Sequence, residues 1–387
     1  MLSACLWTVN CHAVDQADQA GQADQCKVLD TVDAAIKALM AKHQIPGVAV
    51  AVTADSRRCF YNFGVMSKDS MQPITSETLF EAGSITKTLT ATLAAYAQAD
   101  GKLSMSDSVS KYVPSLRGSV FDRISVLNVA THTAGGLPLQ VPDEVAKDEQ
   151  LMPYFLHWKP RQAAGTSRTY SNPSAGLLGI VAANSIQMTF ADAMEKRLFP
   201  ALGMKHTFVN VPAELMATYA QGYNKKDQPV RVARNVLWAE TYGVKTTTGD
   251  LIRFVMLNME PAQLGPTWQR AIDATHVAHF RVGDMVQGLM WEQYPYPLKL
   301  EQLLSGNSER MIFQDMPATR VAAGAPRTDV LMNKTGSTSG FGGYVAFVPS
   351  RKIGVVIMAN KNYPIPDRVG AAYQILDRLD RQARAAD

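Results

Sequence analysis

The sequence has few cysteines, and their positions do not indicate a metal site. Four cysteines occur in 387 residues, at positions 5, 11, 26 and 59. None of them belongs to the Cys/His spacing that is typical of zinc ligands, so we expect no metal and no other cofactor. Cys26 and Cys59 follow the N-terminal segment. In an oxidising compartment they could form a disulfide between the first helix and the first hairpin, and two separate buried thiols are the alternative.

Long apolar runs and strong charge are also absent. No run of about 20 apolar residues occurs, so we expect no transmembrane helix and no stable membrane insertion. The net charge of +4 is small, and the basic residues are scattered, which argues against a nucleic acid as partner. A composition of 47% hydrophobic and 19% charged residues is that of an ordinary globular protein. The length allows one large domain or two lobes around a cleft.

The first 25 residues differ from the rest. The segment MLSACLWTV is apolar but short, no basic residue precedes it, and Cys11-His12-Ala13 could end a signal-peptide cleavage site. Leu2-Ser3-Ala4-Cys5 is similar to a lipoprotein acylation box, and a start codon placed inside a longer leader is a further explanation. Residues 14–25 are polar and of low complexity, which predicts a disordered lead-in. We expect an exported protein with an atypical or truncated leader.

Hydrophobic periodicity predicts strands at both ends of the chain and helices between them. The expected elements are a helix at 30–42, strands at 48–52 and 59–65, a helix at 85–99, strands at 330–335, 343–348 and 353–359, and a helix at 366–385. The predicted class is α/β (α+β). A mainly antiparallel sheet would be built from residues 26–82 and about 205–387 and flanked by helices. A helical lobe would be inserted at about 83–204, with the active site between the lobes.

The first candidate for chemistry is the pair Ser84 and Lys87. Strand-like sequence passes into a helix here, which places the serine at the first helical turn, near unpaired backbone N–H groups. Lys87 is three residues further and shares the same face. A lysine in a dry cleft could accept the serine proton or stabilise the alkoxide. The pattern alone is common. Ser108 and Lys111 match it too, and a solvated loop is the better interpretation there.

Tyr170-Ser171-Asn172 is the only Tyr-x-Asn in the chain. Tyr170 could act as a general base or acid if neighbouring cations favour its phenolate. Asn172 carries both a donor and an acceptor and could orient a substrate amide. The alternative is a helix-capping loop in which Tyr170 is only packed and Asn172 is the cap.

Residues 334–338 (KTGST) form the third motif, at the end of a predicted strand. The N–H of Ser337 together with that of Ser84 would make an oxyanion hole. Gly336 has no side chain and would let a substrate come close. Lys334 supplies a charge for a substrate carboxylate or lowers the pKa of the tyrosine. An ordinary surface turn is the alternative.

The three motifs occur in one order, each at an element boundary. The pair Ser-x-x-Lys and Lys-Thr-Gly is found in class A β-lactamases and penicillin-binding proteins. From about residue 30 to 379 the chain resembles the class C β-lactamases, the cephalosporinases among the penicillin-recognising serine hydrolases. The resemblance rests on IPGVAVAV (45–52), TLFEAGSITKTLTATL (78–93), THTAGGLPLQVPDEV (131–145), TYSNPSAGLLG (169–179), YGVKTTTGDL (242–251), NKTGSTSGFGGYVAFVP (333–349) and MANKNYPIPDRV (358–369).

The resemblance implies a role for each motif residue. Ser84 would be the acylated nucleophile, Lys87 and Tyr170 would share the acid–base work, and Lys334 would support them. The N–H groups of Ser84 and Ser337 would form the oxyanion hole. The implied substrate-binding residues are Gln140 and Asn172 at the acylamino side chain, Thr335, Ser337 and Asn362 near the carboxylate, and Gly336, Tyr242 and Glu292 along the site.

The chain departs from the family pattern in several places. Met290 stands where a glycine is usual, near the expected rim of the cleft. Ile365 stands where many relatives have an asparagine, and His132 replaces a usual tyrosine. The loop 234–238 lacks a common proline-glycine pair. These departures concern substrate range and loop conformation.

The implied function is hydrolysis of the β-lactam amide bond of cephalosporins and penicillins through an acyl-serine intermediate. The protein would be a periplasmic monomer whose only partner is its small-molecule β-lactam substrate. A DD-peptidase or esterase of the same fold would use the same nucleophile. A penicillin-binding sensor would be acylated and stay acylated, and such sensors are normally attached to a transmembrane segment.

Overall fold

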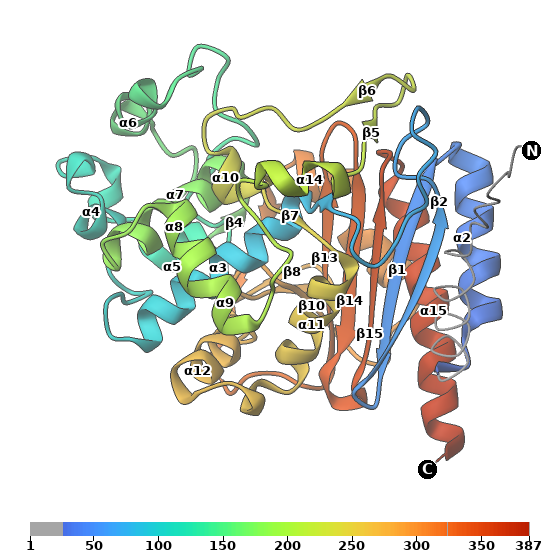
Figure 1. Ribbon diagram of the computed structural model, residues 1–387. Helices are drawn as coiled ribbons and strands as arrows, with labels where there is room; N and C mark the ends of the chain where they lie inside the picture. Colours follow the sequence, from blue (N-terminus) through green and yellow to red (C-terminus); the bar gives the residue numbers. More distant parts are fainter. Residues whose placement is uncertain (1–25, 323, 387) are drawn as a thin grey trace, which may run out of the picture.

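A nine-stranded antiparallel sheet forms the centre of the protein (Figure 1). The computed structural model describes residues 26–322 and 324–386, so the expected leader and lead-in lie outside the described residues. The strand order is β12-β8-β9-β10-β13-β14-β15-β1-β2. Their bounds are β1 Gly47–Ala54, β2 Arg57–Gly64, β8 Phe280–Val282, β9 Met285–Gln287, β10 Glu292–Pro295, β12 Thr319–Arg320, β13 Val330–Ser337, β14 Gly342–Val348 and β15 Ile353–Ala359.

The two ends of the chain share this sheet, as predicted. Strand β1 pairs antiparallel with β15, with Val48 opposite Ala359 and Ala54 opposite Ile353. The mixed fold with a large antiparallel sheet flanked by helices is therefore confirmed. The prediction did not include β8, β9, β10 and β12, which extend the sheet beyond β13.

Helices cover both faces of the sheet (Figure 1). They are α2 Leu29–His43, α3 Thr86–Ala99, α4 Val109–Tyr112, α5 Val126–Ala130, α6 Asp148–His157, α7 Asn172–Ser185, α8 Phe190–Ala193, α9 Phe199–Leu202, α10 Trp238–Thr241, α11 Thr248–Met259, α12 Pro266–Thr275, α13 Leu300–Gly306, α14 Glu309–Phe313 and α15 Ile365–Ala386. Three two-stranded pairs lie apart from the main sheet: β3 Phe80–Glu81 with β7 Lys245–Thr246, β4 Ser167–Arg168 with β11 Met316–Pro317, and β5 Gly222–Tyr223 with β6 Pro229–Val230.

Alternation along the strands explains how both faces are buried. On β1, Val48, Val50 and Val52 pack in the core cluster that includes α2 and α15. Ala49 and Ala51 belong to the second cluster, on the opposite face. Successive side chains of a strand point to opposite faces, so an unbroken apolar run marks a strand that is covered on both sides. The second cluster continues from the sheet into the helices α3 and α7, which carry the candidate site.

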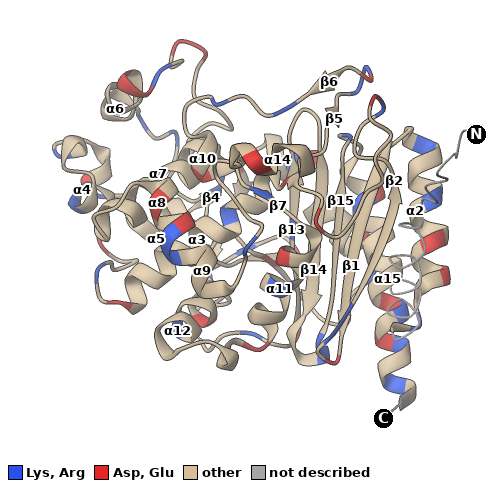
Figure 2. Ribbon diagram, viewed as in Figure 1, with Lys and Arg blue, Asp and Glu red and all other residues tan. Residues whose placement is uncertain are grey.

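Charged residues of both signs are mixed along the surface helices. Figure 2 shows Lys and Arg interspersed with Asp and Glu along helices such as α2 and α15. Within residues 26–322 and 324–386, no individual helix has both the length and the apolar character needed to cross a bilayer. The helix α7 and the segment Phe190–Leu202 meet that test only together, as a pair bent by 74°. The same part of the chain holds no group of three or more His, Cys, Asp or Glu placed to bind a metal ion.

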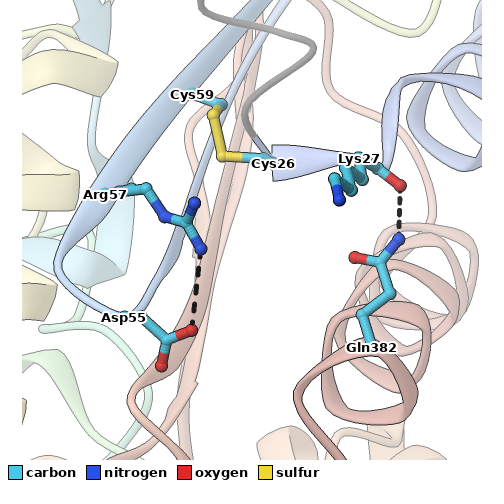
Figure 3. Close-up of a disulfide and its surroundings, with 6 residues drawn as sticks. All are labelled: Cys26, Lys27, Asp55, Arg57, Cys59 and Gln382. Carbon is cyan, nitrogen blue, oxygen red and sulfur yellow. Dashed lines mark hydrogen bonds and ion pairs between the residues drawn. A yellow bond between two sulfur atoms is a disulfide. The ribbon is translucent and has the colours of Figure 1, made fainter. Parts of the chain in front are cut away.

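Cys26 and Cys59 form a disulfide, which decides between the two alternatives left open by the sequence (Figure 3). Cys26 lies just before α2 and Cys59 lies on β2, with 6.2 Å between their Cα atoms. Next to the bridge, the Gln382 side chain on α15 donates a hydrogen bond to the Lys27 carbonyl. The start of the described chain is thus held to the sheet and to the last helix.

We expect the variant Cys26→Ala to be less stable than the parent protein. The bridge closes a loop with a sequence separation of 33, and such cross-links contribute about 2–4 kcal/mol by restricting the unfolded chain. Urea unfolding measures the difference. Reductant should lower the midpoint of the parent protein and leave the variant unchanged. Equal midpoints for the oxidised and reduced parent would contradict a stabilising bridge.

Candidate active site

Residues from distant parts of the sequence line one cavity of about 580 Å³. It opens where the end of β13 meets the turn before α3 and the start of α7. Nine of the twelve candidate site residues line it: Ser84, Gln140, Tyr170, Asn172, Glu292, Lys334, Thr335, Ser337 and Asn362. Lys87, Gly336 and Tyr242 are not among the lining residues.

Ser84 and Lys87 are in direct contact. The serine lies in a 3₁₀ turn, Gly83–Ile85, that leads into α3, and not in the α-helix itself. Lys87 lies in the first turn of α3, three residues after the serine, and side chains at this spacing share a face. The Lys87 Nζ atom donates to Ser84 Oγ at 2.8 Å and to the Thr241 carbonyl at 2.9 Å. The lysine is fully buried, and burial lowers its pKa to about 8, with the charge of Lys334 acting in the same direction and Tyr170 opposing it.

The second Ser-x-x-Lys match is different in kind. Residues 109–112 form the short helix α4, where a loop was expected. The Lys111 side chain is 59% exposed, and its Nζ atom bonds Asp107 at 2.7 Å. An exposed ammonium group keeps its water shell, so burial does not lower its pKa, and at neutral pH it stays protonated and cannot accept a proton from a hydroxyl group. Burial distinguishes the two serine–lysine pairs.

Tyr170 lies directly before α7, in contact with two lysines. Its ring centroid is 5.3 Å from Lys87 Nζ and 5.0 Å from Lys334 Nζ. The N-cap of α7 is Ser171, whose Oγ accepts from the Ser174 N–H at 3.0 Å. Capping therefore belongs to the serine of the motif, and the tyrosine side chain points into the cavity.

The surroundings of Tyr170 favour its phenolate. Burial alone would raise the pKa of the phenol. The charges of Lys334 and Lys87, with a hydrogen bond to Ser84, outweigh burial and lower the pKa to about 8. A phenol with a pKa near 8 that is hydrogen-bonded to the serine can exchange a proton with it.

Lys334 is held by a buried acidic partner. Its Nζ atom lies 3.5 Å from Glu292 Oε1, and Arg168 Nη2 lies 3.1 Å from the same oxygen. Burial would lower the pKa of Lys334, but Glu292 and Tyr170 outweigh it and raise the pKa. Arg168 was not identified from the sequence. Its only signal is its place two residues before Tyr170.

The register explains why the third motif faces the cavity. Strand β10 pairs only with residues 330–333 of β13. Lys334, Thr335 and Ser337 continue β13 along β14 alone, so the other edge of the strand is open at that point.

Gly336 is placed differently from the expectation. A Cβ atom at this position would lie 2.0 Å from the carbonyl oxygen of Ala82, so the glycine admits the chain's own segment before Ser84 and not a substrate. Gly83, with a φ of +53°, makes the reciprocal contact, because a Cβ there would lie 2.4 Å from the Ser337 nitrogen. The two glycines bring the backbones of Ser84 and Ser337 together.

A second arginine that the sequence did not indicate supports this edge. Arg368 of α15 is fully buried, and its Nη1 atom donates to the Gly336 carbonyl at 2.6 Å and to Ser337 Oγ at 3.1 Å. Its Nη2 atom donates to Asn362 Oδ1 at 3.3 Å. Arg368 lies in one of the stretches that match the family, but nothing in that match distinguishes it from its neighbours.

The other expected residues have mixed positions. Asn172 is 7% exposed, and its Oδ1 atom is buried without a hydrogen-bond partner among the described residues, whereas Gln140 is exposed at the rim. Tyr242 follows α10, next to the Thr241 carbonyl that Lys87 bonds. Met290 is 1% exposed with a φ of +59°, so it lies in the core and not at the rim.

The comparisons with known proteins show the family of the chain. The profile of the Beta-lactamase family matches residues 32–380. A β-lactamase of Pseudomonas fluorescens is 51% identical over 92% of this chain and 99% of its own length, and one of Lysobacter lactamgenus is 47% identical over 91% and 92%. A crystal structure of a class C β-lactamase with cefoxitin has a TM-score of 0.89 at 52% identity and covers 92% of this chain and 99% of that chain. The chain therefore belongs to the Beta-lactamase family.

We expect Gly336→Ala to damage both stability and activity. The new methyl group would push back a rigid backbone carbonyl, which costs about 1–3 kcal/mol. Moving Ser337 away from Ser84 should lower kcat/KM for a chromogenic cephalosporin by tenfold or more, as about 1 Å of misplacement does elsewhere. The matched control is Gly370→Ala on α15, where nothing lies within 4 Å. If both variants kept parental activity, the close approach would have no role.

Proposed function

We propose that this chain is a class C serine β-lactamase that opens the ring of cephalosporins and penicillins through an acyl-Ser84 intermediate. The observation that carries the proposal is the buried contact of Lys87 Nζ with Ser84 Oγ at 2.8 Å, beside a tyrosine of lowered pKa. Membership of the Beta-lactamase family supports the substrate class.

Acylation needs a proton acceptor and a site for negative charge. Ser84 Oγ attacks the lactam carbonyl carbon while its proton passes to the coupled pair Lys87 and Tyr170, which share their ionisation. The N–H groups of Ser84 and Ser337 receive the developing oxyanion. The C–N bond then breaks, and the pair returns the proton to the ring nitrogen. Lys334 stabilises the phenolate during these transfers.

The substrate is held at two ends of the cavity. The buried Oδ1 atom of Asn172, which lacks a partner among the described residues, suits the amide N–H of an acylamino side chain, with Gln140 at the rim. Thr335, Ser337 and Asn362 lie on the side where Arg368 adds a buried positive charge, which suits a substrate carboxylate. Glu292 lines the same cavity and holds Lys334 by an ion pair.

Deacylation separates the candidate functions. In a β-lactamase, water attacks the acyl-Ser84 ester with Tyr170 or the substrate amine as base, which releases the opened lactam as a carboxylate and restores the serine. A D-alanine carboxypeptidase is the second candidate. A solved structure from Pseudomonas syringae, 48% identical with a TM-score of 0.89, carries both names, "Beta-Lactamase/D-Alanine Carboxypeptidase".

We propose that the protein acts in an oxidising compartment. The Cys26–Cys59 disulfide is typical of exported proteins, and it supports the periplasm as the place of action. We propose that the protein acts there as a monomer.

Steady-state hydrolysis of a chromogenic cephalosporin in the presence of a chelator tests the activity. We expect repeated turnover by the parent protein and a fall of roughly 10⁴-fold or more for Ser84→Ala, the loss typical of removing a nucleophile. Ser108→Ala is the control, since it removes the serine of the second motif, whose lysine is exposed. One stoichiometric burst followed by no turnover would favour a sensor. Release of D-alanine from a peptidoglycan peptide without β-lactam turnover would favour the carboxypeptidase.

Removal of the Lys334 charge should shift the pH profile of kcat/KM. In Lys334→Gln the phenolate loses a stabilising cation and Lys87 loses a repelling one, so the pKa values of both groups rise from about 8. The proton acceptors then stay protonated to a higher pH, and the acidic limb moves upward. Lys111→Gln should leave the profile in place. An unmoved limb in Lys334→Gln would show that these ionisations do not limit acylation.

A further inference from the structure

A buried histidine, His132, makes three contacts with Tyr170 and its two neighbours in the chain, and it has no part in the proton transfers proposed above. His132 follows α5 and is 2% exposed. Its carbonyl oxygen accepts from the Thr169 N–H at 2.9 Å, and its Nδ1 atom lies 3.3 Å from the Ser171 N–H. Its ring packs on the Tyr170 ring, with 4.7 Å between centroids and 47° between planes. The residue thus binds the backbone on either side of Tyr170 and touches the tyrosine ring as well.

The protonation state of His132 is fixed by its neighbours. Burial, then the charges of Arg168 on β4, Lys87 on α3 and Lys334 on β13, hold its pKa well below the ordinary 6.5. A neutral ring that accepts a hydrogen bond at Nδ1 carries its proton at Nε2. The Nε2 atom has no hydrogen-bond partner among the described residues. His132 therefore adds no fourth cation beside the tyrosine, and it keeps an acceptor for Ser171.

The backbone at this position also selects the residue. His132 has a φ of +60°, in the left-handed region. Asn, Asp and His are enriched there among residues other than glycine, whereas bulky apolar residues are not. The left-handed turn directs the carbonyl to Thr169 while the side chain reaches Ser171. A strained residue that is over-determined by its contacts is typical of functional sites.

We propose that His132 is a positioning residue for Tyr170: it holds the phenol against Ser84, Lys87 and Lys334 by clamping the backbone on both sides and packing on the ring. The inference rests on the proposed function, in which Tyr170 exchanges the serine proton. It predicts that damage to His132 acts through Tyr170 and through no other group.

The test uses the full chain and the rate of acylation by a fluorescent penicillin, which requires no turnover. His132→Asn keeps the acceptor and the left-handed backbone but removes the ring, and His132→Phe keeps a ring but removes the acceptor. We expect roughly 10–100-fold slower acylation for His132→Asn, because the ring of Tyr170 can then turn away from the lysines. The acidic limb of its pH profile should move upward, toward the ordinary tyrosine pKa of 10.0. His132→Phe should lose less than His132→Asn and should show a smaller shift of the limb.

A double-mutant cycle distinguishes positioning from general packing. In the Tyr170→Phe background, His132→Asn should cause little further loss, since the group it positions no longer exchanges a proton. The control is His276→Asn. This histidine is also buried, bonds Asn258 at 3.0 Å and lies outside the residues that line the cavity, so it should lower stability without moving the pH profile.

Two results would overturn the inference. One is an equal loss from His132→Asn in the parent and in the Tyr170→Phe background. The other is slower acylation without any shift of the acidic limb in a variant whose melting temperature is unchanged. If His132→Asn does not fold, the cycle is carried out with His132→Phe, whose melting temperature is measured first because a bulky apolar residue is not favoured at a φ of +60°. Failure of the proposed function is visible separately, as acylation of the parent protein without turnover of cephalosporin.

Discussion

The site depends on one phenol hydroxyl held between two buried ammonium groups. Lys87 and Lys334 repel each other, and two uncompensated charges in the interior would be costly. The two positive charges favour the phenolate form of Tyr170, and the phenolate in turn reduces their repulsion. The carboxylate of Glu292 compensates the charge of Lys334 from the other side. The same balance that keeps the interior stable keeps a proton mobile near pH 8.

The fold brings these charges together by close backbone approach. Gly83 and Gly336 allow the turn before α3 to touch the end of β13. The overhang of β13 beyond β10 leaves an open strand edge at the same point. Lys87 and Lys334 stand on α3 and β13, Ser84 lies in the turn before α3, and Tyr170 lies in the short segment between β4 and α7.

Much of this could be predicted from the sequence where patterns are long or chemistry is distinctive. The strands near residues 48–52 and 353–359 were identified because their apolar runs are long, and Ser84 with Lys87 because a serine–lysine pair before a helix has a chemical meaning. Strands β8 and β9 have three residues each, too few to show an alternation. Arg168 and Arg368 carry no local pattern, since their role is to fill the hydrogen bonds of groups far away in the sequence. What a side chain at position 336 would meet depends on the segment that packs against it, here Ala82. The pairing of Cys26 with Cys59 depends on the distance between their Cα atoms in the fold. Neither quantity is local.

The two ends of the sheet have a consequence for solubility at high concentration. An exposed strand edge can pair with another chain and seed aggregation, and short or charged edges prevent this. One edge strand, β12, has only two residues, Thr319–Arg320. The other, β2, begins with the exposed pair Arg57 and Arg58 and is cross-linked through Cys59 to the segment before α2. The sheet thus has a very short strand at one edge, and two exposed arginines with a covalent bridge at the other, which are features that disfavour pairing with further strands.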